Sequence, residues 1–158
     1  MAMMAVRYPK LQELGVEVIG VSVDSVNAHK LWDEVELKEL IGAAVPFPLG
    51  ADRGGKLGSM FGTYDQQQGV NQRAHFLIDP QGVVQLVEVL PSSVGRNVDE
   101  LIRIIQACQE QQSSGASIPA GWQPGDSALS GDLQTAGRIW QEWKPERAAQ
   151  QHARSGLV

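Results

Sequence analysis

The sequence has few cysteines, little positive charge and no long apolar run, and each shortage excludes a class of protein. Cys108 is the single cysteine among 158 residues, so the chain can form neither an intrachain disulfide nor a cysteine-based metal cluster. The formal net charge is −5, with 13 Lys and Arg against 18 Asp and Glu. This balance argues against a nucleic-acid partner, because phosphate contacts need clustered cations.

The same shortages bear on location. No apolar run is long enough to cross a bilayer, and no basic stretch precedes the short apolar segment at the start of the chain. We therefore expect neither a membrane segment nor a secretory signal. The low cysteine content fits a reducing compartment, and we predict the cytoplasm.

The sequence does contain the succession of helix and strand patterns that is typical of an α/β fold. Residues 1–14 predict a helix that Pro9 should kink or interrupt and Gly15 should end. The β-branched run 16–23 predicts a strand buried on both faces. Ser25 and its neighbour Asp24 are good N-cap residues for a helix over 26–41.

The middle of the chain predicts a hairpin between less regular pieces. We expect a short edge strand at 46–49, a helix at 55–61 and an exposed loop over 64–72. Strands at 74–78 and 83–89 flank Asp-Pro-Gln-Gly, which suits a type I turn. A helix over 98–112 follows, with apolar residues at three- and four-residue spacing.

The composition changes at the Ser- and Gly-rich segment 113–117, which predicts a boundary. We expect a core at 1–112, an arm at 113–150 containing a short helix within 131–149, and a disordered tail at 151–158. Trp122, Trp140 and Trp143 suggest that the arm docks either on its own domain or on a second subunit.

Five stretches in order, covering about residues 5 to 126, resemble the peroxiredoxins of the alkyl hydroperoxide reductase and thiol-specific antioxidant family. They are LGVEVIGVSVDS at 14–25, FPLGAD with the later FG at 47–62, RAHFLIDP at 73–80, VGRNVDE at 94–100 and PAGWQPG at 119–125. The resemblance implies an α/β, thioredoxin-like fold with a central mixed sheet flanked by helices. It also implies homodimers or higher rings, for which the strand ending near Leu90 is the candidate pairing edge.

The resemblance implies an antioxidant oxidoreductase of cell redox homeostasis, which reduces hydrogen peroxide and organic hydroperoxides with a thiol and needs no cofactor. In that family the attacking thiolate lies at the N-terminus of the helix before the central strand, where its charge is favoured. Residues 1–14 resemble the body of that helix. We therefore expect the chain to be truncated, without the N-terminal strands and the peroxidatic cysteine.

This departure leaves the activity of the chain open. Ile118 stands where two-cysteine members carry the resolving cysteine. We expect the chain as given to be inactive as a peroxidase. The alternatives are a non-catalytic subunit or interaction module, and a reading frame that continues upstream to the missing cysteine.

Two arginines match functional positions of the family. Arg73 matches the arginine that hydrogen-bonds the peroxide and stabilises the thiolate; the alternative is an ordinary arginine at a strand start that makes a surface ion pair. Arg96 matches a second family arginine, which orients a glutamate that is missing here; the alternative is a solvated residue before a helix. Cys108 lies on an apolar helix stripe and is expected to be an inert core residue. The histidines have no spacing typical of metal ligands, and no metal site is expected: they are His29, His75 and His152.

Overall fold

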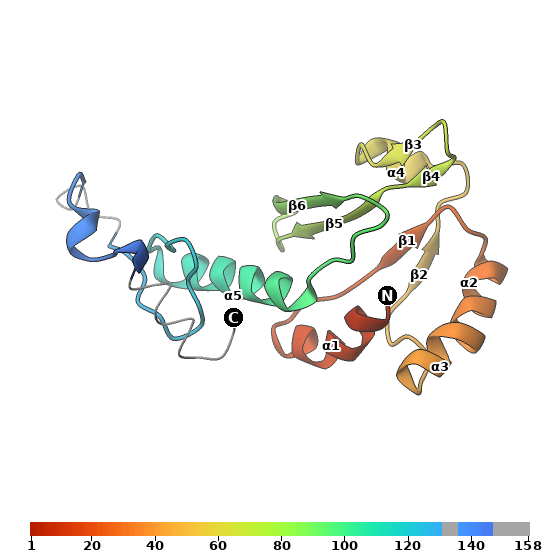
Figure 1. The fold of residues 1–158 in the computed structure, drawn as a ribbon, viewed down its shortest axis with the longest axis horizontal. Helices are drawn as coiled ribbons and strands as arrows, with labels where there is room; N and C mark the ends of the chain where they lie inside the picture. The colour runs from red at the N-terminus through yellow and green to blue at the C-terminus, as the bar shows by residue number, and fades with distance from the viewer. Residues whose placement is uncertain (131–135, 147–158) are drawn as a thin grey trace. The chain divides into compact units, whose positions relative to one another are not determined.

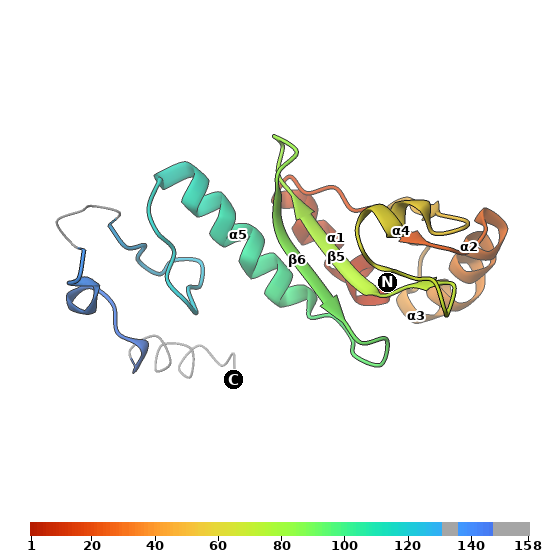
Figure 2. The same cartoon turned by 90° about the horizontal axis from the view of Figure 1, so that it is seen from above.

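The computed structural model describes residues 1–130 and 136–146, and it divides into two units, Met1–Asp99 and Glu100–Val158 (Figures 1 and 2). The tail predicted at 151–158 lies outside the described residues, as do residues 131–135 and 147–149 of the stretch in which a helix is predicted. The predicted boundary between core and arm at residue 112 stays a prediction. No helix in the described part of the chain is both long and apolar enough to span a membrane.

The first unit opens with α1 (Ala2–Glu13), which runs through Pro9. The interruption predicted at Pro9 is therefore not seen, because one face of the helix is held by burial of Ala5, Tyr8 and Leu11. Packing of such a face outweighs local propensity. The predicted stop is confirmed: Gly15 has a φ of 70°, and its N–H donates to the carbonyl of Gln12.

The helix predicted over 26–41 is present as three consecutive pieces. They are α2 (Val26–Trp32), the π-helical turn η1 (Asp33–Leu37) and α3 (Lys38–Ile41). Ser25 is the N-cap, since its side chain accepts a hydrogen bond from the N–H of Ala28.

Helix α1 contacts α3, and the ring of Tyr8 meets that of Phe47 edge-on with centroids 5.4 Å apart.

The first sheet is shorter than the sequence predicts. Strand β1 covers only Gly20–Ser22 of the predicted 16–23 and pairs in parallel with β2 (Leu49–Ala51). The predicted burial on both faces is wrong: Ile19 is 69% exposed and Val21 is 41% exposed. Among the described residues β1 pairs with β2 alone, so nothing in this part of the chain pairs with its other edge.

Helix α4 (Lys56–Met60) confirms the predicted helix at 55–61. The carboxylate of Asp52 accepts hydrogen bonds from the N–H groups of Leu57 and Gly58 at its start. The loop predicted at 64–72 contains a small hairpin of β3 (Tyr64–Asp65) and β4 (Val70–Asn71). Its turn was missed because Asp65, whose side chain accepts from the N–H groups of two following glutamines, supplies the turn in place of proline.

The predicted hairpin is confirmed as β5 (Arg73–Ile78) and β6 (Val84–Leu90), which run side by side in Figures 1 and 2. Asp79 organises the turn, because its Oδ1 accepts from the N–H groups of Gln81 and Val83. On β6 the half-buried side chains alternate with exposed ones, and the exposed set includes Val87 and Val89. Parallel and antiparallel pairing thus both occur in this α/β unit.

Helix α5 (Val98–Ser114) confirms the predicted helix at 98–112, and its predicted apolar stripe is largely buried. In the second unit Arg103 donates from Nη1 to the carbonyl of Trp122 at 2.8 Å, and Trp122 donates from Nε1 to the carbonyl of Asp126 at 2.9 Å. Trp122 is therefore a docking residue within its own unit. A 3-10 turn, η3 (Ile139–Gln141), is the element described within the predicted helix 131–149, and its Trp140 is exposed.

Candidate active site

Two arginines converge on the start of α1. Arg73, the first residue of β5, donates from Nε to the carbonyl of Ser92. Arg96 donates from Nη1 to the carbonyl of Ala74 at 2.7 Å. The pKa of the Met1 ammonium is lowered first by burial, then by the charge of Arg96 and then by that of Arg73. The two guanidinium groups therefore act at one place, the N-terminal end of α1.

Local structure explains how residues 23 positions apart meet. A turn after β6, closed by the N–H of Val94 donating to the carbonyl of Pro91, sends the chain back toward β5. Arg96 then reaches the β5 backbone at Ala74, next to Arg73. We call the pair of Arg73 and Arg96 with the start of α1 the arginine site.

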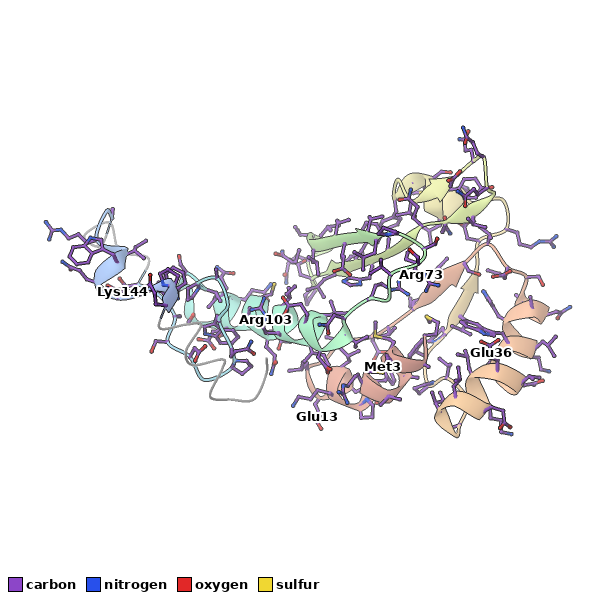
Figure 3. All side chains as sticks on the ribbon, viewed as in Figure 1. Met3, Glu13, Glu36, Arg73, Arg103 and Lys144 are labelled. Carbon is purple, nitrogen blue, oxygen red and sulfur yellow. The ribbon has the colours of Figure 1, made fainter. Side chains whose placement is uncertain are left out.

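The other side of this site is formed by the first sheet. A Cβ built at Gly20 would lie 2.5 Å from Cε of Met1 and 2.9 Å from Cδ2 of Leu49. Glycine at this position of β1 therefore lets Met1 lie directly against the β1–β2 pair. Figure 3 shows Arg73 on the side of the hairpin that faces α1, where Met3 is labelled.

The electrostatics of the arginine site favour a negatively charged group. A helix N-terminus carries a partial positive charge, and guanidinium groups bind oxyanions through several N–H donors. The pKa of Arg96 is lowered by burial and by the charge of Arg73, and Glu88 opposes this shift. Such a site can stabilise a thiolate or the negative charge that develops on a peroxide oxygen.

The chain's own thiol lies in the other unit and in the opposite kind of environment. Cys108 is half-buried on α5, and burial raises the pKa of its thiol. A thiol with a raised pKa is protonated at neutral pH and is a poor nucleophile. Cys108 is thus half-buried and not in the core as predicted, and its inert role stays a prediction.

The structure also brings together a cluster that the sequence analysis missed. Ser22 Oγ donates to Oδ2 of Asp24 at 2.7 Å and lies 2.7 Å from Nε2 of His29, which is buried. The other ring nitrogen of His29, Nδ1, has no hydrogen-bond partner among the described residues, so no carboxylate orients the imidazole as in a catalytic triad. The carboxylate of Asp24 instead accepts from the Ser22 hydroxyl, so this cluster links β1 to α2 and is not a catalytic triad.

The remaining predicted residues are placed as follows. His75 lies on β5 opposite Glu88 of β6, and His152 is outside the described residues. Within residues 1–130 and 136–146, no three His, Cys, Asp or Glu side chains are grouped as metal ligands would be. The spacing Ser-x-Asp followed by His five residues later was the available signal for the Ser22 cluster.

Comparison with known proteins identifies what the chain is similar to. The model of the AhpC/TSA family matches residues 1–87. The selenocysteine-containing peroxiredoxin PrxU of Peptoclostridium acidaminophilum is 45% identical over 146 residues, which cover 91% of this chain and 72% of that protein. Peroxiredoxin 2 of Thermoplasma acidophilum is 38% identical over 125 residues, covering 79% of this chain and 62% of that protein.

Solved structures give the same result for the fold. The reduced 2-Cys peroxiredoxin of Plasmodium vivax matches with a TM-score of 0.75 and 31% identity, over 80% of this chain and 65% of that one. A cysteine-to-serine mutant of peroxiredoxin 6 of Arenicola marina matches with a TM-score of 0.78 and 29% identity, over 89% of this chain and 67% of that one. The chain thus spans roughly two thirds of these relatives, and the predicted thioredoxin-like fold of the peroxiredoxin type is confirmed.

Proposed function

Because this chain belongs to the AhpC/TSA family of peroxiredoxins, we propose that its arginine site serves thiol-dependent reduction of peroxides. The observation that carries the proposal is the convergence of Arg73 and Arg96 on the N-terminal end of α1. In the reaction a thiolate attacks one peroxide oxygen and the O–O bond breaks. The thiolate becomes a sulfenic acid, and the other oxygen leaves as water or an alcohol after taking up a proton.

Each arginine has a distinct role in this proposal. Arg73 is exposed at the start of β5, and its side chain is anchored through Nε to Ser92, which leaves other N–H donors for the peroxide. Arg96 is half-buried and anchored to Ala74, and its charge favours the anionic nucleophile. Both charges also favour the oxygen that becomes negative as the O–O bond breaks.

We further propose that the chain as given does not turn over peroxide by itself, because its one thiol is Cys108. The test is peroxide consumption by the purified chain with an external dithiol, which also provides the thiol reductant of the proposed cycle. We expect the uncatalysed rate. Rapid consumption that disappears in Cys108→Ser would contradict this part of the proposal.

The nucleophile that the arginine site would serve can be a thiolate or a selenolate. A relative that is 45% identical is named for its selenocysteine, so a selenol is a specific candidate as well as a cysteine. Two measurements distinguish a thiolate from a selenolate: selenium analysis of the protein isolated from its source, and reading of the codons ahead of Met1. An in-frame cysteine codon without selenium would exclude the selenol. The absence of both a cysteine and a selenocysteine would exclude this route to an active enzyme.

A second candidate is a non-catalytic subunit that pairs with other copies of itself or with a complete relative in a homodimer or larger ring. The observation in its favour is a set of exposed apolar side chains on strands, which includes Val21, Val87 and Val89. Size measurement of the chain alone and mixed with a complete relative tests it. A monomer that ignores the relative would remove this candidate. A reducing compartment such as the cytoplasm suits either function.

A further inference from the structure

One pair of titratable side chains on the hairpin has no part in the proposed chemistry. His75 and Glu88 are directly opposite each other in the register of β5 and β6. His75 Nδ1 and Glu88 Oε2 lie 3.4 Å apart, and the two side chains are only 13% and 35% exposed. Neither atom has a hydrogen-bond partner among the described residues, so each is buried with its charge or proton incompletely satisfied.

The pair lies next to the arginine site. His75 is the residue after Ala74, whose carbonyl accepts the hydrogen bond from Arg96, and it shares a face of β5 with Arg73, two residues away. Glu88 acts on Arg96 as a counter-charge, and Arg96 acts on His75 as a like charge. The charged groups that act on the two side chains are thus each other and Arg96, and the arginine site adds Arg73 and the Met1 ammonium.

We propose that Glu88 and His75 form a pH-dependent counter-charge that regulates how strongly the arginine site holds an anion. With His75 neutral, the Glu88 carboxylate attracts Arg96 and competes with any anion that binds there. With His75 protonated, the imidazolium pairs with Glu88 at the opposite position, and Arg96 is released toward the anion. The inference rests on the proposed function of the arginine site and adds its regulation.

The sign of the effect follows from the surroundings of His75. Burial lowers the pKa of His75, Glu88 raises it and Arg96 lowers it further. The imidazole is therefore neutral at neutral pH and gains its proton as the pH falls below its usual pKa of about 6.5. Anion affinity at the arginine site should rise as the pH falls through this range.

The test uses the full ¹⁵N-labelled chain with inorganic sulfate as the probe, followed at the Nε–H signals of Arg73 and Arg96 by NMR. Sulfate keeps its charge between about pH 5 and about pH 7.5, whereas histidine does not. We expect sulfate to bind roughly fivefold more tightly at the lower pH, as expected for one added charge near a partly buried site. With Met1 acetylated, His75→Gln should bind weakly and equally at both pH values.

Glu88→Gln should bind tightly at both pH values, because the competing carboxylate is gone. Glu34→Gln is the matched control: this exposed carboxylate lies 3.7 Å from Lys30 on the α2–η1 segment, and its removal should leave the pH dependence intact. Acetylation of Met1 separates the ammonium, which also titrates, from His75. If variants fail to fold, the imidazole shifts of the unaltered chain still show whether His75 titrates together with the arginine signals.

The outcomes separate this inference from the proposed function. Sulfate binding that is lost in Arg96→Gln but is independent of pH in the unaltered chain would overturn the counter-charge and leave the arginine site in place. pH dependence that survives in His75→Gln with an acetylated Met1 would also overturn it. If sulfate binding depended on neither arginine, both the counter-charge and the proposed function of the arginine site would be overturned.

Discussion

The start of α1 and the later turns of α5 are two helix environments of opposite character. The first collects two guanidinium groups and contains no thiol. The second holds the only thiol of the chain, half-buried and without a basic residue in the last turn of the helix. Positive surroundings lower the pKa of a thiol and burial raises it, so the comparison predicts a reactive thiol at the start of α1 and an unreactive one at position 108.

The largest expected effect comes from loosening α1 itself. Leu11 lies on the buried face of this helix and is fully buried. Leu11→Ala should lower the free energy of unfolding by about 3 kcal/mol, because apolar burial is lost and a cavity is left behind. Chemical denaturation measures the change. Met60→Ala is the control, because Met60 is 74% exposed and should change stability by less than about 0.5 kcal/mol. Equal losses in the two variants would contradict the placement of Leu11 in the core.

A thiol moved from α5 to α1 should gain reactivity. In Ala2→Cys combined with Cys108→Ser, the new thiol lies in the first turn of α1, near the arginine site. We expect its pKa to fall below about 8.5 and its alkylation at neutral pH to be at least about tenfold faster than that of Cys108 in the unaltered chain. Iodoacetamide rates as a function of pH measure both. Equal rates would mean that the start of α1 does not favour an anion.

A smaller effect is expected on the pKa of the Met1 ammonium when either guanidinium is removed. Arg96→Gln should raise the pKa of the Met1 ammonium toward its ordinary value, and Arg73→Gln should raise it less, because Arg96 is the stronger of the two charge effects. NMR of the terminal amine or its acylation rate against pH reports the shift. Arg53→Gln, an exposed position, is the matched control, and a shift there as large as for Arg96→Gln would refute the proposed proximity.

The smallest effect concerns acid stability. Hydrogen bonds from the N–H groups of Leu57 and Gly58 lower the pKa of Asp52. A lowered pKa gives a contribution that is present above the unfolded pKa of about 3.9 and is lost as the pH falls through the folded value. Asp52→Asn should therefore lose part of its stability at about pH 7 and approach the unaltered chain at about pH 2. Thermal unfolding of both proteins at the two pH values measures the difference in stability. A difference that is the same at both pH values would contradict the prediction.

The sequence predicted best those elements whose determinants are local. The hairpin β5–β6 was predicted because Asp79 and the residues after it encode their own turn, and the helix at 26–41 because Ser25 caps it. The length and burial of β1 could not be read locally, since both depend on which strands lie beside it. An apolar β-branched run is the same pattern whether or not a second neighbour covers it.

The candidate site was predicted in part. Arg73 and Arg96 came from the resemblance to the family, while their anchoring to Ser92 and Ala74 required the turn after β6. Neither the cross-strand pair His75–Glu88 nor the Ser22–His29 contact was predicted. Both depend on side chains that meet across elements, and a single sequence gives the spacing of residues without the register between strands.

The most direct test of the account is sulfenic acid labelling at low peroxide concentration, with the unaltered chain and the Ala2→Cys, Cys108→Ser variant side by side. The account predicts that the cysteine at the start of α1 is labelled while Cys108 stays unlabelled. Prompt labelling of Cys108, or no labelling at α1 where the arginines lie, would contradict it.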